Sequence, residues 1–509
     1  MLVKIILLIL FFGCMIAVGL YARKSANSMT DFVLGGRSVG PWLSAFAYGT
    51  SYFSAVVFVG YAGQFGWKYG LASTWIGLGN AVIGSLLAWV AMGRRTRVMT
   101  HHLEVATMPD FFGKRYDSNI LRVVASAIAF VFMIPYTASV YNGLSRLFGM
   151  AFDIPYTVCV VTMAVLTGVY VILGGYMATA INDFIQGIIM LFGIVAVIGA
   201  VLSGQGGFIE AVRKLSELPS DVPVTLGQQG AFASFFGTDP LNLLGVIILT
   251  SLGTWGLPQM VHKFYAIKSE KAIKTGTIVS TFFAVIVSGG CYFLGGFGRL
   301  FDAPELYKAD GSIMYDAIIP AMLSTLPDIL IGIVIILVLS ASMSTLSSLV
   351  LTSASTLTLD FIKGNIVKDM DDKKQLIYIR VLIVFFIVVS VVLALNPPTF
   401  IAQLMGISWG ALAGAFLAPF LYGLYWKGVT RAGVWASFVC GVGITVSNMY
   451  FKFIASPINA GAAAMIVGLI VTPIVSLISP KINSSFVDKI FQCYDNTAKV
   501  SSKEYLKED

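Results

Sequence analysis

Hydrophobic residues occupy long runs of this 509-residue chain, and mostly short polar segments separate the runs. A bilayer core of about 30 Å is crossed by a helix of about 20 apolar residues. The pattern predicts thirteen spanning helices, near residues 3–21, 41–66, 72–93, 120–146, 155–174, 183–203, 240–262, 275–298, 329–357, 378–395, 399–426, 432–451 and 462–479. The short connections indicate one transmembrane domain over residues 1–480, followed by a tail over 481–509.

Composition supports an all-α integral membrane protein. The chain is 57% hydrophobic and 11% charged, whereas soluble domains carry about 25% charged residues. If the N-terminus lies outside, the segments on the inner side, which include 263–274, hold 25 of the 33 Lys and Arg residues. Basic residues concentrate on cytoplasmic loops. The chain is therefore predicted to lie in the cell membrane with a cytoplasmic tail, and its net charge of +8 does not indicate nucleic-acid binding.

Two predicted spans carry helix breakers near their middle. Residues 47–55 contain Gly49 and several hydroxyl residues, and the span at 240–262 contains Gly253, Gly256 and Pro258. Unwound backbone at membrane depth survives only inside the protein or beside a cavity, where its carbonyl groups can bind a cation. Because the two interrupted spans are five helices apart, they fit the inverted repeat of secondary transporters, with halves at spans two to six and seven to eleven.

The ninth span is unusually rich in hydroxyl groups. From Ser340 to Thr358, 11 of 19 residues are Ser or Thr. Small hydroxyl residues often serve only to pack helices closely. The alternative is an ion site, because the adjacent Ser344 and Thr345, with Ser347 and Ser348 one turn later, place oxygens where they can converge on one hard cation.

Further positions are candidates for an ion site, for close helix packing or for short helices in loops. Asp183 is the acidic side chain expected at membrane depth; it either serves an ion site or caps the inner end of span six. Gly406, Gly410 and Gly414 form a close-packing face. The long loops 204–239 and 299–328 are each expected to hold a short amphipathic helix, at 208–218 and 313–323.

Motifs of enzymes and cofactor sites are not found. The five cysteines form no CxxC pattern, the three histidines have no metal spacing, and neither a phosphate loop nor a nucleophile elbow occurs. We therefore expect no enzymatic activity, no cofactor and no metal other than a coupling ion.

Three segments resemble the sodium/solute symporter family, which includes bacterial proline, sialic acid and sugar symporters. They read FVLGGRSVGPW (32–42), NDFIQG (182–187) and SMSTLSSLVLTSASTLTLDF (342–361). The resemblance covers almost the whole chain. It implies thirteen transmembrane helices around a five-plus-five inverted-repeat (LeuT-like) core.

The resemblance also implies site residues. A sodium ion is expected at backbone carbonyls of Thr50, Phe53 and Ala341 and at the hydroxyls of Ser344 and Thr345. Some family members hold a second sodium ion, and the matching residues here are Asp183, Ser347 and Ser348. The positions that match substrate contacts are Ser54, Tyr136, Thr250 and Thr254, with Trp255 beside them.

Departures from individual relatives leave the solute open. Tyr52 stands where proline symporters have an aspartate, and the arginine that sialic acid symporters place in the third core helix has no counterpart around Phe132. The chain is expected to import a small organic solute (an amino acid, a monocarboxylate or a sugar) with sodium by alternating access. The alternative is a transporter-fold sensor or receptor without net transport. The oligomeric state stays open.

Overall fold

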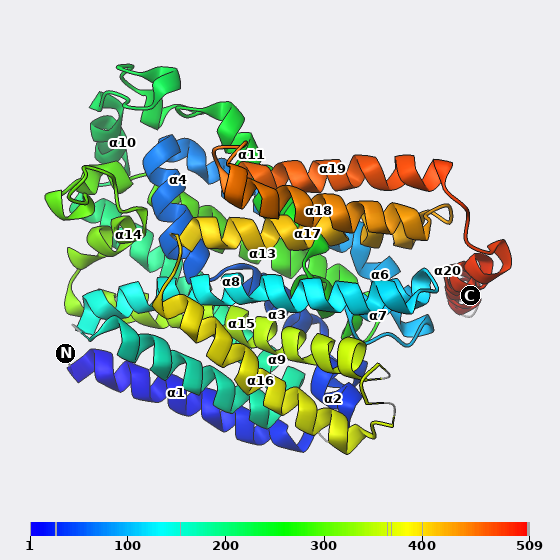
Figure 1. The fold of residues 1–509 in the computed structure, drawn as a ribbon. Helices are drawn as coiled ribbons and strands as arrows, with labels where there is room; N and C mark the ends of the chain where they lie inside the picture. The colour runs from blue at the N-terminus through cyan, green and yellow to red at the C-terminus, as the bar shows by residue number, and fades with distance from the viewer. Residues whose placement is uncertain are drawn as a thin grey trace.

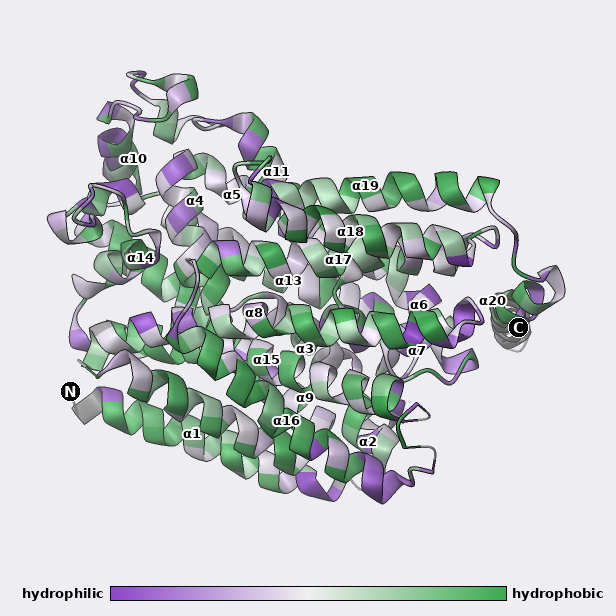
Figure 2. Cartoon of the chain, viewed as in Figure 1, coloured by the Kyte–Doolittle hydropathy of each residue, from purple (hydrophilic) through white to green (hydrophobic). Residues whose placement is uncertain are grey.

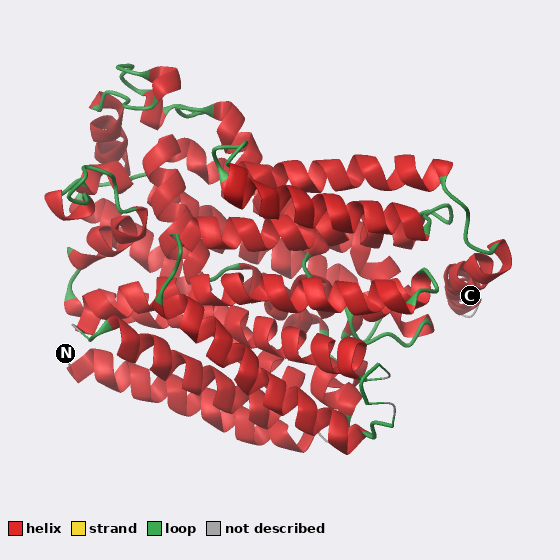
Figure 3. Ribbon diagram, in the orientation of Figure 1, coloured by secondary structure: helices red, strands yellow, loops and turns green. Residues whose placement is uncertain are grey.

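The computed structural model describes residues 2–25, 28–152, 154–363, 365–367, 369–399 and 401–505. Helices make up this part of the chain, and no strand occurs in it (Figure 3). The longest α-helices are α1 (Leu2–Ala22), α8 (Asn119–Phe152), α9 (Tyr156–Gly204), α13 (Glu270–Gly295), α15 (Asp328–Thr356), α16 (Asp372–Leu395), α17 (Ile401–Tyr425), α18 (Arg431–Phe451) and α19 (Pro457–Ile478).

The remaining helices form the broken spans, the two ends of the bundle and the tail. The α-helices are α2 (Met29–Leu34), α3 (Pro41–Tyr52), α4 (Ala62–Tyr69), α5 (Thr74–Gly79), α6 (Arg94–His102), α7 (Met108–Arg115), α10 (Phe208–Glu217), α11 (Pro240–Gly256), α12 (Pro258–Tyr265), α14 (Tyr315–Ser324) and α20 (Ser484–Tyr505). Segments of π-helix are η3 (Val56–Tyr61), η5 (Asn80–Leu87), η6 (Trp89–Gly93) and η11 (Leu357–Ile362). Short 3₁₀ turns are η1 (Arg23–Ser25), η2 (Gly35–Arg37), η4 (Gly70–Ser73), η7 (Pro223–Thr225), η8 (Ala231–Ala233), η9 (Gly298–Phe301) and η10 (Pro304–Leu306).

The long helices lie side by side and define two ends of the molecule. The N-terminus, α10 and α14 lie at one end, and α6, α7 and α20 lie at the other (Figure 1). Apolar residues cover the outer helices, and polar residues gather toward the ends (Figure 2). The side chains of Phe192 and Leu10 are 75% and 64% exposed on this apolar exterior, as expected of a surface that faces lipid. The protein is therefore a multi-pass membrane protein.

The number of helices that are long enough to span a membrane is smaller than the thirteen crossings predicted. Ten helices of the described chain are long and apolar enough to span a membrane, or eleven if the bent pair α11 and α12 is one span. Two of the ten, Val56–His102 and Tyr156–Gly204, have 47 and 49 residues, more than twice the length that one crossing needs. Each contains a glycine with positive φ, Gly70 and Gly175, where the chain can reverse. The count of thirteen stays a prediction, which holds if each of these two segments crosses twice.

Several local predictions are confirmed. The amphipathic helices expected in the two long loops correspond to α10 and α14. The glycine face of α17 packs closely on α19, because a Cβ at Gly410 would lie 2.7 Å from the Cα of Gly461. Helices α15 and α17 are central: 78% and 89% of their most apolar windows are buried, against 22% for α1.

Candidate functional site

The break in α3 exposes backbone carbonyls in the centre of the bundle. The helix ends at Tyr52, Phe53 is extended (φ −107°, ψ 121°), and the helical path resumes as η3. The residues before the break, Gly49 and Thr50 among them, have low helix propensity. The carbonyls of Thr50 and Phe53 lie at or next to the broken end, where continuous i→i−4 pairing stops. The predicted interruption is confirmed.

Helix α15 places two hydroxyl groups against this break. The Ser344 Oγ donates a hydrogen bond to the Thr50 carbonyl at 3.0 Å and lies 3.1 Å from the Ala341 carbonyl. The Thr345 Oγ1 lies 3.1 Å from the Ala341 carbonyl and 3.5 Å from that of Phe53. The structure thus brings together all five residues expected at the first sodium site, from two segments separated by almost 300 positions in the chain.

The chemistry of this cluster suits a small hard cation. Three carbonyl and two hydroxyl oxygens converge, and all five residues are at most 2% exposed. Hydroxyl and carbonyl oxygens are acceptors with free lone pairs, and the hydroxyl hydrogens can rotate away from a bound ion. Oxygen donors of this kind replace the hydration shell of an alkali cation at membrane depth.

A second polar cluster lies one turn further along α15. The Ser348 Oγ is 2.8 Å from the Ser51 Oγ and accepts a hydrogen bond from the Lys263 Nζ at 2.9 Å. The same ammonium pairs with the Asp183 Oδ2 at 3.5 Å. The Ser347 Oγ instead donates to the Ser344 carbonyl at 2.9 Å.

Lys263 is the member of this second cluster that sequence reasoning did not place there. The count of basic residues put it with the inner segment 263–274, but the structure buries its side chain to 2% exposure. Its position at the end of an apolar span was the only local feature of the sequence that could have indicated this burial. Asp183, the second member, lies well inside α9, and it pairs with the Lys263 ammonium rather than with a helix end.

Aromatic side chains gather next to the break in α3. The Trp409 ring lies 5.8 Å from the Tyr136 ring, edge to face, and 6.1 Å from the Tyr52 ring, stacked. Within the described chain, the buried Tyr136 hydroxyl and Trp409 Nε1 lie beside each other but make no hydrogen bond of good geometry. Ser54, which is 1% exposed, lies next to the Tyr136 hydroxyl. Sequence reasoning predicted Ser54 and Tyr136 but missed Trp409, which lies on α17 between Gly406 and Gly410.

The three predicted substrate residues on α11 lie along the wall that this helix shares with η5. The Thr254 Oγ1 donates to the Gly84 carbonyl at 3.1 Å, and the Trp255 Nε1 donates to the Ile83 carbonyl at 3.0 Å. The Thr250 carbonyl accepts a hydrogen bond from the Tyr52 hydroxyl. These contacts join α11 to the aromatic cluster through Tyr52.

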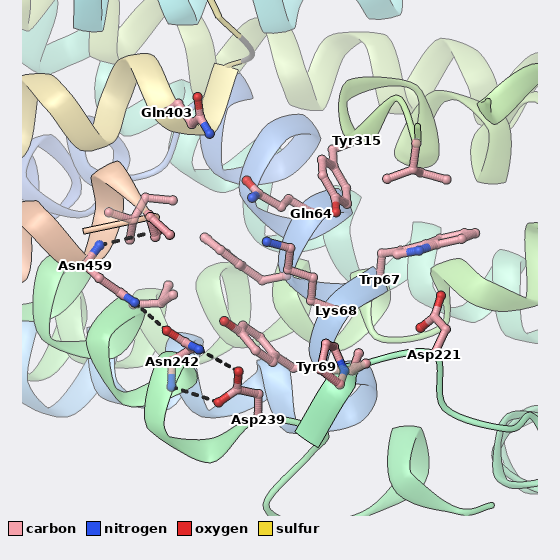
Figure 4. A pocket seen from close by; sticks show the side chains of 18 of the residues that line it. Gln64, Trp67, Lys68, Tyr69, Asp221, Asp239, Asn242, Tyr315, Gln403 and Asn459 are labelled. Carbon is pink, nitrogen blue, oxygen red and sulfur yellow. Dashed lines mark hydrogen bonds between the residues drawn. The ribbon is translucent and has the colours of Figure 1, made fainter. Parts of the chain in front are cut away.

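A cavity of about 680 Å³ opens at the end of the molecule that carries α10 and α14 (Figure 4). Gln64 and Lys68 point into it from α4, and Gln403 approaches from α17. Phe65 also lines it, and the Phe65 ring lies 5.0 Å from the buried Tyr61 ring. Since Gln403 and Trp409 are six residues apart on α17, the aromatic cluster lies about 9 Å deeper along that helix.

At the opposite end, Arg37 joins three segments. Its guanidinium donates to the carbonyls of Val105 at 2.5 Å, Tyr265 at 3.3 Å and Thr100 at 3.4 Å. Burial lowers the pKa of Arg37, while the surrounding carbonyl oxygens favour its charged form. The guanidinium therefore holds together the backbone segments that contain Thr100, Val105 and Tyr265.

Replacing Arg37 with alanine is expected to destabilise the purified protein by about 1–3 kcal/mol, because three buried carbonyls lose a charged donor. The midpoint of denaturation in detergent measures the change. Arg23→Ala is the control. Because Arg23 is exposed, this variant should leave the midpoint unchanged. Equal midpoints for the two variants would contradict this role for Arg37.

The chain is similar in sequence and in fold to known sodium-coupled symporters. The family model described as "Sodium:solute symporter family" matches residues 32–441. A sodium/proline symporter of Staphylococcus aureus (strain JH9) is 29% identical over 500 residues, which cover 94% of this chain and 92% of that protein.

Solved structures share the fold. A Na⁺-coupled sialic acid symporter in a substrate-bound outward-open state has a TM-score of 0.78 at 17% identity, covering 94% of this chain and 99% of the other. Mhp1, a nucleobase-cation-symport-1 family transporter in a closed conformation, has a TM-score of 0.54 at 13% identity, covering 92% and 98%.

Proposed function

This chain belongs to the sodium:solute symporter family and is a sodium-coupled solute symporter, and from that premise we propose that its sodium ion binds between α3 and α15. The observation that carries the proposal is the approach of the Ser344 and Thr345 hydroxyls to the carbonyls at the break in α3, at 3.0 and 3.5 Å. The proposed ligands are the carbonyl oxygens of Thr50, Phe53 and Ala341 and the two hydroxyl oxygens.

An ion at this position links sodium binding to the conformation of the transporter. It would hold α3 and α15 together while bound, and its release would free the two helices to move apart. Inward movement of one elementary charge supplies about 2.3 kcal/mol per 100 mV of membrane potential. The ion therefore drives import of the solute by alternating access. Sodium acts as the coupling ion, and we propose no other cofactor.

The solute is proposed to bind beside the aromatic cluster of Tyr52, Tyr136 and Trp409. An indole N–H can only donate, and the Trp409 Nε1, which lies beside the Tyr136 hydroxyl, is available to an acceptor on the solute. Amino acids and monocarboxylates offer a carboxylate, and sugars offer hydroxyls. Proline, the solute named for the staphylococcal relative, is the first compound to test. Ser54, Thr250, Thr254 and Trp255 stay proposed substrate positions.

Uptake into proteoliposomes tests the whole proposal. Purified protein is first screened by thermal shift against amino acids, monocarboxylates and sugars, with sodium and with choline. Solutes that stabilise it only in sodium are then offered to proteoliposomes with and without an inward sodium gradient. Accumulation that requires the gradient supports symport, whereas stabilisation without accumulation would favour the sensor alternative.

Replacing Trp409 with phenylalanine is expected to weaken binding of the solute by about 10- to 100-fold and to leave stabilisation by sodium unchanged. One hydrogen-bond donor to a charged acceptor is lost, worth about 1.5–3 kcal/mol, while most of the ring packing is retained. The solute concentration for half-maximal thermal shift measures the effect. Trp435→Phe, on α18 away from the break, is the control. A parallel loss of sodium stabilisation in Trp409→Phe would contradict a separate solute site.

The orientation of the chain is also a proposal. The two termini lie at opposite ends of the bundle (Figure 1), as an odd number of crossings requires. The excess of Lys and Arg favours an outer N-terminus and a cytoplasmic C-terminal tail. The cavity lined by Gln64 and Gln403 then opens to the outside. We propose that residues 1–480 form the transporter domain in the cell membrane and that 481–509 are its tail.

A further inference from the structure

The Lys263 side chain is a cation enclosed by the groups expected to hold a second sodium ion. Its Nζ lies 2.9 Å from the Ser348 Oγ and 3.5 Å from the Asp183 Oδ2. The Tyr176 ring centroid is 5.2 Å from the same nitrogen. Two of the three residues assigned to a second sodium ion, Asp183 and Ser348, are therefore already in contact with a positive charge that belongs to the protein.

Burial makes this arrangement costly unless the charges compensate each other. Lys263 is 2% exposed and Asp183 0% exposed, and an unpaired ion at that depth would lose several kcal/mol of hydration free energy. In the described part of the chain, the second carboxylate oxygen, Asp183 Oδ1, receives no hydrogen bond. The ammonium is thus the positive charge that balances the Asp183 carboxylate.

The second cluster is connected to the first. The Ser348 hydroxyl that accepts from Lys263 is 2.8 Å from the Ser51 Oγ. The carbonyl of Ser51 in turn lies 3.3 Å from the Thr345 Oγ1, one of the proposed sodium ligands. A cation in the second cluster therefore helps to orient the broken end of α3 through Ser51.

We infer that the Lys263 ammonium permanently occupies the second cation position, so that this protein binds one sodium ion where two-sodium relatives bind two. The inference rests on the proposed sodium site between α3 and α15. The tethered ammonium supplies the charge and the contacts of a second ion, but it does not dissociate. It therefore adds no driving force, and one sodium ion is coupled to each solute.

Equilibrium binding of ²²Na⁺ to the purified full-length protein tests this without knowledge of the solute. The wild type is expected to bind one ion with a Hill coefficient of about 1. Ser344→Ala should bind this ion about 10- to 100-fold more weakly and show no site of wild-type affinity. Lys263→Ala frees the Asp183 carboxylate and is expected to bind two ions, and the double variant Lys263→Ala/Ser344→Ala should bind one. Lys268→Ala, which removes an exposed lysine five residues further on, is the control and should bind one.

The possible results distinguish failure of this inference from failure of the proposed function. Two ions in the wild type, of which Ser344→Ala weakens one and retains the other at wild-type affinity, would overturn the role of Lys263 and leave sodium coupling intact. An equal count in Lys263→Ala and the wild type would also overturn it. Failure of the wild type to bind ²²Na⁺ would overturn the proposed sodium site and this inference with it. If Lys263→Ala does not fold, the wild type and Ser344→Ala still decide the number of sites.

Discussion

Replacing Ser344 with alanine is expected to raise the sodium concentration for half-maximal uptake by about 10- to 100-fold. The hydroxyl is one of five oxygens around the proposed ion and also bonds to the Thr50 carbonyl at 3.0 Å. Loss of a contact with a charged group is worth about 1.5–3 kcal/mol, and each 1.4 kcal/mol corresponds to tenfold in affinity. Sodium-dependent uptake, or ²²Na⁺ binding if no solute is yet known, measures the change.

Three further variants make that experiment specific. Thr345→Ala should behave like Ser344→Ala, whereas Thr345→Ser retains the hydroxyl and should recover most of the sodium affinity. Ser355→Ala removes a hydroxyl of the same helix that is buried without a partner in the described chain, and it should leave sodium affinity unchanged. Wild-type sodium activation in both Ser344→Ala and Thr345→Ala would refute the site.

Replacing Gly66 with alanine is expected to abolish or strongly reduce the yield of folded protein. A Cβ at this position would lie 2.0 Å from the Gly295 carbonyl oxygen and 2.1 Å from its carbon. Since these are backbone atoms, α4 and α13 would have to separate, and overpacking of a tight core costs about 1–3 kcal/mol or more. Size-exclusion chromatography of the detergent-solubilised protein, followed by its melting temperature, measures the loss.

The matched control for this variant is Gly199→Ala. No atom lies within 4 Å of a Cβ at Gly199, within α9, and alanine has the higher helix propensity by about 1 kcal/mol. This variant should be as stable as the wild type or slightly more stable. If Gly66→Ala matched the control in yield and melting temperature, the close approach of α4 and α13 would not be required for folding.

The broken helices and the hydroxyl-rich helix could be predicted because their signals are local. Glycine and hydroxyl residues before Phe53, and Pro258 in the other broken span, weaken a helix wherever they occur. The extended conformations of Phe53 and Leu257 lie at those positions. The convergence of Ser344 with Thr50 followed from the inward-facing hydroxyl face and the family resemblance.

The position of Lys263 could not be predicted in the same way. A lysine at the end of an apolar span ordinarily reaches the interface with water, so counting it with the cytoplasmic residues was the reasonable expectation. Its burial depends on Asp183 and Ser348, which are 80 and 85 positions away in the chain. Trp409 was missed for a similar reason, because its contacts with Tyr52 and Tyr136 depend on how α17 packs against α3 and α8.

The cavity above the aromatic cluster bears on how blockers of this transporter can be designed. At about 680 Å³, it has room for roughly twenty water molecules at about 30 Å³ each. In the proposed orientation, a solute would enter this water-filled cavity before it reached the proposed site at Trp409. A compound that carries a long tail would leave that tail among Lys68, Tyr315 and Asn459, and it would wedge the entrance open instead of being carried through.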